Sequence, residues 1–270
     1  MSLKNLMVQL DSGERTKLRL EIAVSIALKH QARLLGVFGQ RAEAGVAGIV
    51  AAWPSEDYVA AANASKSQFE IATAGLANAE WRDIDCGNDT ELLRHITDVG
   101  RYADLILLGQ HDESVKAYVP AELPEEIVLN SGRPVLLIPY IGAFTASFER
   151  PLIAWNRSRE AARAVNDAFP LIENCQEATV VSLDTQHDAA VVACDELARH
   201  LACHGIKSKT DILMVNDIGI MDMLLNRLTD RDADLLVMGA HGQIAFPFFS
   251  RGAGTKHILK HMTVPVLMSY

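Results

Sequence analysis

The stretch ADLLVMG (residues 233–239) decides the fold, because a short apolar run that closes on glycine is typical of a strand buried in a parallel sheet. A near copy, ADLILLG, stands 130 positions earlier at residues 103–109. After each copy comes a helical segment and then a second apolar run beside a proline, Pro134 or Pro265. The closing glycine and that proline are 25 residues apart in the first copy and 26 in the second. A repeat of this kind indicates a duplicated domain.

The two halves also begin alike, with LMVQLD at residues 6–11 and PLIAWN at residues 151–156, each before an amphipathic helical segment. Strand and helix then alternate with short links, which favours a doubly wound α/β fold. The predicted strands are residues 6–10, 33–38, 81–85, 105–109, 135–139, 152–155, 178–183, 207–214, 235–239 and 264–268. The predicted helices are residues 17–30, 55–77, 89–102, 122–130, 159–170, 189–204, 221–229 and 254–261.

The sequence therefore predicts two tandem doubly wound α/β domains, each with a mostly parallel five-stranded sheet flanked by helices. We place the domains at residues 1–140 and 150–270, with a linker at residues 141–149. The segment Gln40–Ala61 has no counterpart in the second half and contains two glycines, a tryptophan and a proline. Two interpretations of it stay open, a mobile lid and a plain surface insertion.

Composition excludes some classes of function. The chain has 270 residues, 49% of them hydrophobic, and a net charge of −9. Residues 1–145 hold 13 basic and 19 acidic side chains, and the remainder holds 12 and 15, so neither half attracts a nucleic acid by bulk charge. The N-terminal residues lack the apolar core of a signal peptide, and no apolar run reaches membrane-spanning length. We expect a cytoplasmic protein that binds neither nucleic acid nor membrane.

The cysteines and histidines give only weak metal candidates. Four cysteines occur without a CxxC spacing, so we expect free thiols. His200, Cys203 and His204 lie at one expected helix end, and His257 and His261 are four residues apart. One helix end supplies only part of the ligand set that zinc needs. No metal site is predicted.

A glycine-rich pattern follows the decisive strand, with Gly239 and Gly242 first and, after nine intervening residues, Gly252 and Gly254. Glycines let the backbone turn tightly and approach a ligand without a Cβ clash. Gly252 and Gly254 precede the last helix, so their N–H groups can face phosphate oxygens at a helix N-terminus. Thr255 can offer its hydroxyl. The same spacing also fits a tight strand–helix connection that binds nothing.

This pattern, followed by His261 and Pro265-Val266 and preceded by IAWNRS at residues 153–158, resembles the nucleotide motif of universal stress proteins. The resemblance covers essentially the whole chain, once per half. It implies an adenine nucleotide alpha hydrolase-like fold that binds ATP or a related adenine nucleotide, with or without magnesium. The predicted nucleotide-binding residues are Ala154, Trp155, Asn156, Leu183, Met238, Gly239, His241, Gly242, Arg251, Gly252, Ala253, Gly254 and Thr255.

The sequence departs from the family pattern in both halves. Asn156 stands where the family often has aspartate, and Ala253 where it usually has a hydroxyl residue. The first half keeps Asp11 and Ser12, but Asp112 replaces the second glycine, and residues 113–126 contain no glycine. We therefore expect the nucleotide only in the second domain, with the first as a structural partner.

The resemblance also implies that the last strands of the two halves, Val135–Ile138 and Val264–Met268, pair antiparallel as in a dimer made covalent. A further homodimer stays open, and no protein partner can be named. The predicted function is a cytoplasmic stress-response protein that binds nucleotide. The alternatives are a scaffold with a decayed site and a slow ATPase, although the sequence contains neither a P-loop nor a Gly-x-Ser-x-Gly elbow.

Overall fold

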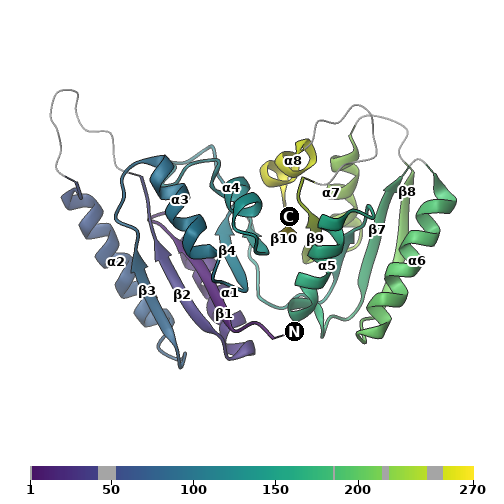
Figure 1. Cartoon of the computed structure of the whole chain (residues 1–270), viewed down its shortest axis with the longest axis horizontal. Coiled ribbons are helices and arrows are strands. Elements are labelled where there is room, and N and C mark those ends of the chain that lie inside the picture. Colours follow the sequence, from purple (N-terminus) through teal and green to yellow (C-terminus); the bar gives the residue numbers. More distant parts are fainter. Residues whose placement is uncertain (1, 42–52, 185, 215–218, 242–251) are drawn as a thin grey trace. The chain divides into compact units, whose positions relative to one another are not determined.

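The computed structural model describes residues 2–41, 53–184, 186–214, 219–241 and 252–270. Contacts between Cα atoms divide the chain into two compact units, residues 2–133 and residues 134–270. Both are α/β units in which helices pack on a sheet (Figure 1). The domain boundaries predicted from the sequence repeat, at residues 140 and 150, stay a prediction.

Four parallel strands lie in the part of the first unit that the structure describes. They are β1 (Asn5–Leu10), β2 (Arg33–Phe38), β3 (Ala79–Asp83) and β4 (Leu105–Gly109). Their order in the sheet is β3-β2-β1-β4, and the β1–β2, β1–β4 and β2–β3 pairs are all parallel. The helices are α1 (Thr16–His30), α2 (Glu56–Ala72), α3 (Asp89–Gly100) and α4 (Leu123–Asn130). Helix α1 packs against α2, and α3 packs against α4.

The described residues of the second unit form six strands. They are β5 (Val135–Ile138), β6 (Pro151–Ala154), β7 (Ala178–Asp184), β8 (Ser208–Met214), β9 (Leu235–Gly239) and β10 (Val266–Ser269). Their order is β5-β10-β9-β6-β7-β8, in which only the β5–β10 pair is antiparallel, with Leu136 opposite Leu267. The helices are α5 (Arg159–Ile172), α6 (His187–Cys203), α7 (Ile220–Asp230) and α8 (Ala253–His261). The predicted antiparallel pairing of the last strands is present.

The apolar runs that identified the strands form the core of each sheet. Leu105–Leu108 and Leu235–Met238 are buried, as expected for strands covered by helices on both faces. The predicted strand at residues 81–85 is displaced, because β3 ends at Asp83 and Asp85 takes a positive φ of 40°. Helix α5 runs through Pro170 to Ile172, so the predicted end at the proline is wrong by two residues.

Part of the segment Gln40–Ala61 lies outside the described residues, namely residues 42–52. Helix α2 begins within this segment, where Ser55 accepts a hydrogen bond from the backbone N of Tyr58 at 3.2 Å. The ring of Trp53 packs on that of Tyr58, with centroids 4.6 Å apart. The end of the segment is therefore an ordinary capped helix start.

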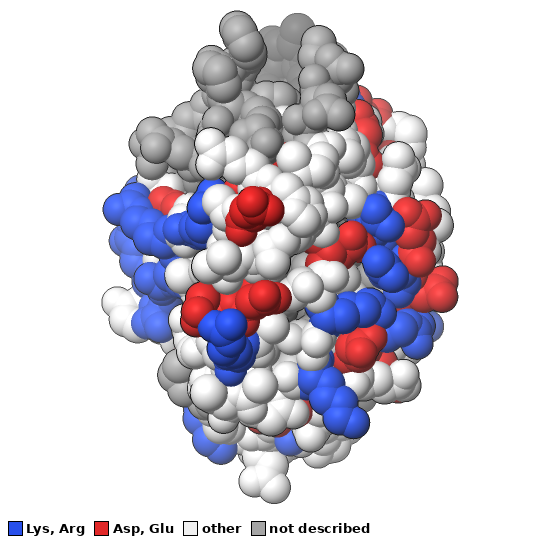
Figure 2. Space-filling view, turned by 90° about the vertical axis from the view of Figure 1, so that its right-hand side faces the viewer, with Lys and Arg blue, Asp and Glu red and all other residues white. Residues whose placement is uncertain are grey.

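Charged side chains of both signs are interspersed on one face of the chain. Figure 2 shows this face, the right-hand side of Figure 1, with basic and acidic residues next to each other. Surface residues of opposite sign also form ion pairs, for example Lys209 with Glu177 at 2.7 Å. Within the described part of the chain, no helix combines the length and the apolar character that a membrane crossing needs.

Candidate functional site

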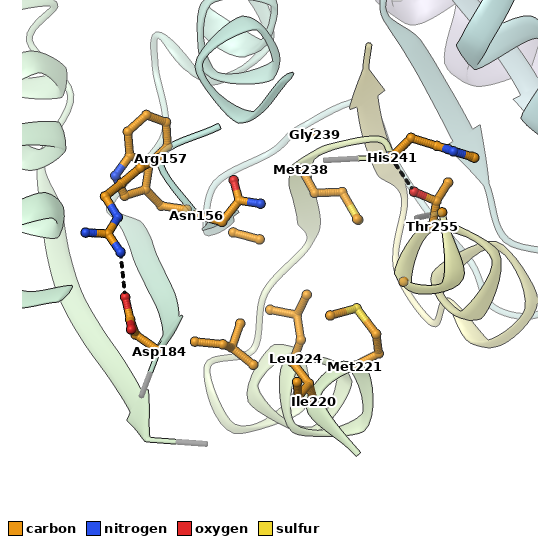
Figure 3. Close-up of a pocket in the computed structure, with 15 residues that line it drawn as sticks. Asn156, Arg157, Asp184, Ile220, Met221, Leu224, Met238, Gly239, His241 and Thr255 are labelled. Carbon is orange, nitrogen blue, oxygen red and sulfur yellow. Dashed lines mark hydrogen bonds and ion pairs between the residues drawn. The ribbon is translucent and has the colours of Figure 1, made fainter. Parts of the chain in front are cut away.

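A cavity in the second unit opens at the carboxyl ends of β6, β7 and β9. Parallel strands bring these ends to one edge of the sheet, which is where open α/β sheets bind ligands. The turn after β6 and the end of β7 form one side of the cavity, and α7, the end of β9 and the start of α8 form the rest (Figure 3). All of these elements belong to one repeat.

The structure brings most of the predicted nucleotide-binding residues together in this cavity. Those that line it are Ala154, Trp155, Asn156, Leu183, Met238, Gly239, His241, Gly252, Gly254 and Thr255. Ala253 begins α8 but does not line the cavity. Gly242 and Arg251 lie outside the described residues. Whether these residues bind a nucleotide stays a prediction.

The turn after β6 is short and closes directly onto α5. The side-chain oxygen of Asn156 accepts a hydrogen bond from the backbone N of Ser158 at 3.1 Å, and the Ser158 hydroxyl caps α5 by accepting from Ala161 N at 3.1 Å. The side chain of Asn156 points into the cavity (Figure 3). Because its oxygen is engaged with Ser158, its amide NH₂ is the group offered to a ligand.

An ion pair that the sequence analysis missed stands beside this turn. Arg157 has a left-handed backbone with φ 63°, and its Nη2 donates to Asp184 Oδ2 at 2.9 Å. The Asp184 side chain is only 12% exposed, whereas that of Arg157 is 50% exposed. Asp184 Oδ1 also accepts from the backbone N of Gln186 at 3.0 Å. The carboxylate at the end of β7 is thus held in place by two donors.

The turn after β9 is built on close backbone approaches. A Cβ at Gly239 would lie 2.5 Å from the backbone N of Ala161, so only glycine fits there. Gly252 has φ 88°, and the imidazole of His241 packs against it. The backbone N of His241 donates to Thr255 Oγ1 at 2.8 Å (Figure 3). The Thr255 oxygen therefore already holds the turn, and its O–H is what it can offer a ligand.

Helix α7 supplies an apolar wall that sequence reasoning also missed. Ile220, Met221 and Leu224 line the cavity, and Figure 3 shows them below Asn156 and Met238. Their spacing places them on one face of the helix, the pattern of an ordinary buried helix face. That pattern predicts burial, and nothing in it distinguishes a cavity wall from the core.

In the first unit, the equivalent turn is closed by its own side chains. Asp11 accepts four hydrogen bonds, from Gly13 N at 2.7 Å, Thr16 Oγ1 at 2.6 Å, Arg19 Nη2 at 3.0 Å and Gln9 Nε2 at 3.2 Å. Burial would raise the pKa of Asp11, but the Arg19 guanidinium and the hydrogen bonds hold it below its ordinary value. This carboxylate has no capacity left for a ligand.

Arg19 fills the space beside the end of β4. Its side chain is 4% exposed, its Nε donates to the backbone O of Gln9 at 2.7 Å, and a Cβ at Gly109 would collide with its Nη1. The corresponding Gly239 meets the backbone of α5 instead. Whether the first unit binds a nucleotide stays a prediction, which rests on Asp112 and the missing glycines of the sequence.

The weak metal candidates are placed as follows. His200 and His204 pack on the ring of Phe169, and His257 Nε2 lies 2.8 Å from Asp222 Oδ1, joining α8 to α7. Among the residues with described positions, no three His, Cys, Asp or Glu side chains are grouped to hold a metal ion.

Comparison with known proteins identifies the fold of this chain. No protein-family sequence model matches the chain, and no curated protein matches it in sequence. A universal stress protein from Archaeoglobus fulgidus DSM 4304 matches in structure with a TM-score of 0.71 and 15% identity, over 98% of this chain and 97% of that one. The chain has the universal stress protein fold. The predicted fold class, α/β with a mostly parallel sheet flanked by helices, is confirmed.

A second solved structure also resembles the chain over its whole length. A protein of unknown function from Pseudomonas aeruginosa PAO1 matches with a TM-score of 0.61 and 15% identity, over 99% of this chain and 92% of that one. Both matches extend over almost the whole length of the two chains compared. The universal stress protein fold of this chain is therefore not limited to one of its halves.

Proposed function

We propose that this chain is a stress-response protein that binds an adenine nucleotide in its second unit, with the first unit as a structural partner. The observation that carries the proposal is the cavity at the carboxyl ends of β6, β7 and β9, which brings together ten predicted nucleotide-binding residues from distant parts of the sequence. The universal stress protein fold supports this location, and the internally satisfied Asp11 supports the absence of a second site.

The dimensions of the cavity suggest which part of a nucleotide enters it. Its volume is about 90 Å³, below the roughly 300–1,000 Å³ of pockets that enclose whole ligands. Leu183, Met238 and Leu224 supply apolar surface for a planar ring. On this proposal the base enters between these side chains, and the sugar and phosphate extend toward Gly252 and Gly254.

Thermal unfolding with and without AMP, ATP and magnesium tests the proposal. Ligand at a hundred times its Kd adds about 2.7 kcal/mol, which for a chain of this size is a rise in Tm of about 5–10 °C. Asn156→Tyr places a large ring in the cavity mouth and should abolish the rise. Ser12→Tyr, at the exposed turn of the first unit, is the matched control and should retain it.

A scaffold protein with an empty site is the second candidate. Two observations favour it: Ala253 has no hydroxyl, and Thr255 Oγ1 already accepts the His241 N–H. Absence of a Tm rise with every adenine compound at millimolar concentration would make this candidate the better one. A slow ATPase has less support, because the carboxylate among the described lining residues, Asp184, is paired with Arg157.

A further inference from the structure

Strand β3 forms one edge of the sheet in the first unit. It is the last strand in the order, and among the described strands it pairs with β2 alone. Three of its five side chains are exposed, namely those of Ala79, Glu80 and Arg82. An edge strand presents backbone N–H and C=O groups that can pair with another chain. The question is therefore which partner strand this edge fits.

Two hydrogen bonds show which backbone groups of β3 face away from β2. The backbone O of Asn78 accepts from Leu34 N at 3.1 Å, and Ile84 N donates to Phe38 O at 2.9 Å. Backbone groups of successive strand residues point alternately to the two sides, so the even-numbered residues face β2. In the described part of the chain, the outward N–H and C=O groups have no hydrogen-bond partner; they belong to Ala79, Trp81 and Asp83.

The order of charges along β3 matches an antiparallel copy of the same strand. Glu80 and Arg82 flank Trp81. If Trp81 lies opposite Trp81 of a second copy, Glu80 of each copy lies opposite Arg82 of the other. The outward backbone groups of Trp81 make the central pair hydrogen-bonded, so the Glu80–Arg82 pairs are of the non-hydrogen-bonded type, with Cα atoms about 4.5 Å apart. Opposite charges in such pairs stabilise the ladder.

The same charges disfavour the neighbouring registers. An antiparallel pair centred on Glu80 places two glutamates opposite each other, and a pair centred on Arg82 places two arginines opposite each other. Like charges directly opposite are destabilising. Both side chains are 44% exposed, and within the chain they form an ion pair at 2.8 Å. The pattern therefore selects one register, which has two-fold symmetry and closes as a dimer.

Strand β8, at the other end of the strand order, does not offer its charges in this way. Its carboxylate Asp211 is only 12% exposed and is held within the chain by Arg231 at 2.7 Å and Arg227 at 3.4 Å. Lys209 pairs with Glu177 at 2.7 Å. The acidic side chain of β8 is therefore not available to a second copy, in contrast to the exposed Glu80.

We propose that β3 pairs antiparallel with β3 of a second copy of this chain, with Trp81 at the two-fold axis and Glu80 of each copy bound to Arg82 of the other. The proposal goes beyond the proposed function, because it involves neither the cavity nor a nucleotide. A pair of five-residue strands is a small interface beside the roughly 1,200–2,000 Å² of stable complexes. The dimer should therefore form and dissociate with concentration.

Sedimentation velocity of the full chain over a range of concentrations tests the proposal. The parent should approach twice the mass of one chain as the concentration rises. Arg82→Glu and Glu80→Arg each place like charges opposite each other and should weaken the dimer at least about tenfold. An equimolar mixture of the two variants should dimerise within about threefold of the parent affinity, because an acidic strand then faces a basic one. A folding defect would not be reversed by mixing.

Lys209→Glu is the matched control for Arg82→Glu. It makes the same change in net charge on the other edge strand, at a side chain that is 43% exposed. This variant should leave the dimer affinity within about twofold of the parent. Circular dichroism of all three variants checks that they fold.

Three outcomes would overturn the proposal. The first is a parent that sediments as one chain at every concentration up to about 1 mM. The second is a dimer that Lys209→Glu weakens as much as Arg82→Glu does, because the interface would then not be at β3. The third is a mixture of Arg82→Glu and Glu80→Arg that dimerises no better than either variant alone, because the Glu80–Arg82 pairs would then not hold the two copies together.

Discussion

The turn after β1 and the turn after β6 differ. The first is closed by its own side chains, and the second borders the cavity. In the first unit, α1 starts at Thr16, five residues after Asp11, and the Asp11 carboxylate turns inward to Arg19, Thr16 and Gly13. In the second unit, α5 starts three residues after Asn156, which points into the cavity. A longer turn and one inward arginine close a sheet edge that a shorter turn leaves open.

Arg19 in the first unit and Arg157 in the second differ in how firmly they are held by their carboxylate partners. Arg19 is 4% exposed and bonds Asp11 and the Gln9 backbone inside the unit. Arg157 is 50% exposed at the rim of a cavity and bonds the Asp184 carboxylate at the end of β7 (Figure 3). A buried pair is fixed by the cost of separating it, whereas a rim pair can be exchanged.

The largest expected effect comes from breaking the closed turn. Arg19→Met keeps the length of the side chain but leaves Asp11 buried without its cation, which should cost about 3–5 kcal/mol in the free energy of unfolding. Urea unfolding measures it, followed by tryptophan fluorescence, to which Trp53 and Trp81 of the first unit and Trp155 of the second contribute. The exposed pair of Arg33 and Glu80 gives the control, because Arg33→Met should cost below about 1 kcal/mol. Equal losses in both variants would show that Arg19 does not stabilise the turn.

The second effect compares the glycines that end β4 and β9. A methyl group at Gly239 meets the Ala161 backbone N at 2.5 Å, so Gly239→Ala forces a backbone shift that should cost about 2–3 kcal/mol. A methyl group at Gly109 meets Arg19 Nη1, whereas Arg19 holds its partners through Nη2 and Nε. Gly109→Ala should therefore cost less, about 1 kcal/mol. Chemical denaturation of both variants checks the order, and a larger loss for Gly109→Ala would reverse the comparison.

The third effect is a pH dependence that belongs to the closed turn. The pKa of Asp11 is lowered below 3.8 in the folded chain, so its contribution to stability is present above about pH 4 and is lost as pH falls through the folded pKa. In Asp11→Asn, the free energy of unfolding should fall less steeply as the pH decreases. In Arg19→Met, burial prevails and the pKa rises, so stability should instead fall as pH rises through it. Urea midpoints between about pH 2 and 6 measure both, and parallel acid limbs in the parent and Asp11→Asn would exclude this role.

The smallest expected effect concerns the second unit, at the contact between α7 and α8. His257 and Asp222 join α8 to α7 at 2.8 Å, with side chains 32% and 63% exposed. Because the pair is solvated, His257→Gln should cost below about 1 kcal/mol. AMP affinity, measured by titration, should stay within about twofold. A tenfold loss of affinity would mean that this bridge, and not packing, positions α7 and α8 at the cavity.

The sequence predicted the fold closely, and the reason is local. Continuous apolar runs such as Leu105–Leu108 predict buried strands regardless of their partners, and all ten strands and eight helices are present. The glycine pattern pointed to Gly239 and Gly252, because a Cβ at Gly239 would meet the backbone of α5 and Gly252 takes a positive φ.

The rest of the site depends on contacts between distant residues. Arg157 and Asp184 are 27 residues apart and belong to no motif, so only the structure reveals the pair. In the sequence, Arg19 is one polar residue of an amphipathic helix. The pattern of Ile220, Met221 and Leu224 predicts core residues. The role of each of these residues depends on the element that packs opposite it. The periodicity of the sequence does not specify that element.

The most direct test of the difference between the two units is the stoichiometry of AMP binding, measured by titration calorimetry of the parent, Asn156→Tyr and Ser12→Tyr chains. The account predicts one AMP per chain in the parent and in Ser12→Tyr, and none in Asn156→Tyr. Two AMP molecules per chain, or binding that survives in Asn156→Tyr and is lost in Ser12→Tyr, would contradict it.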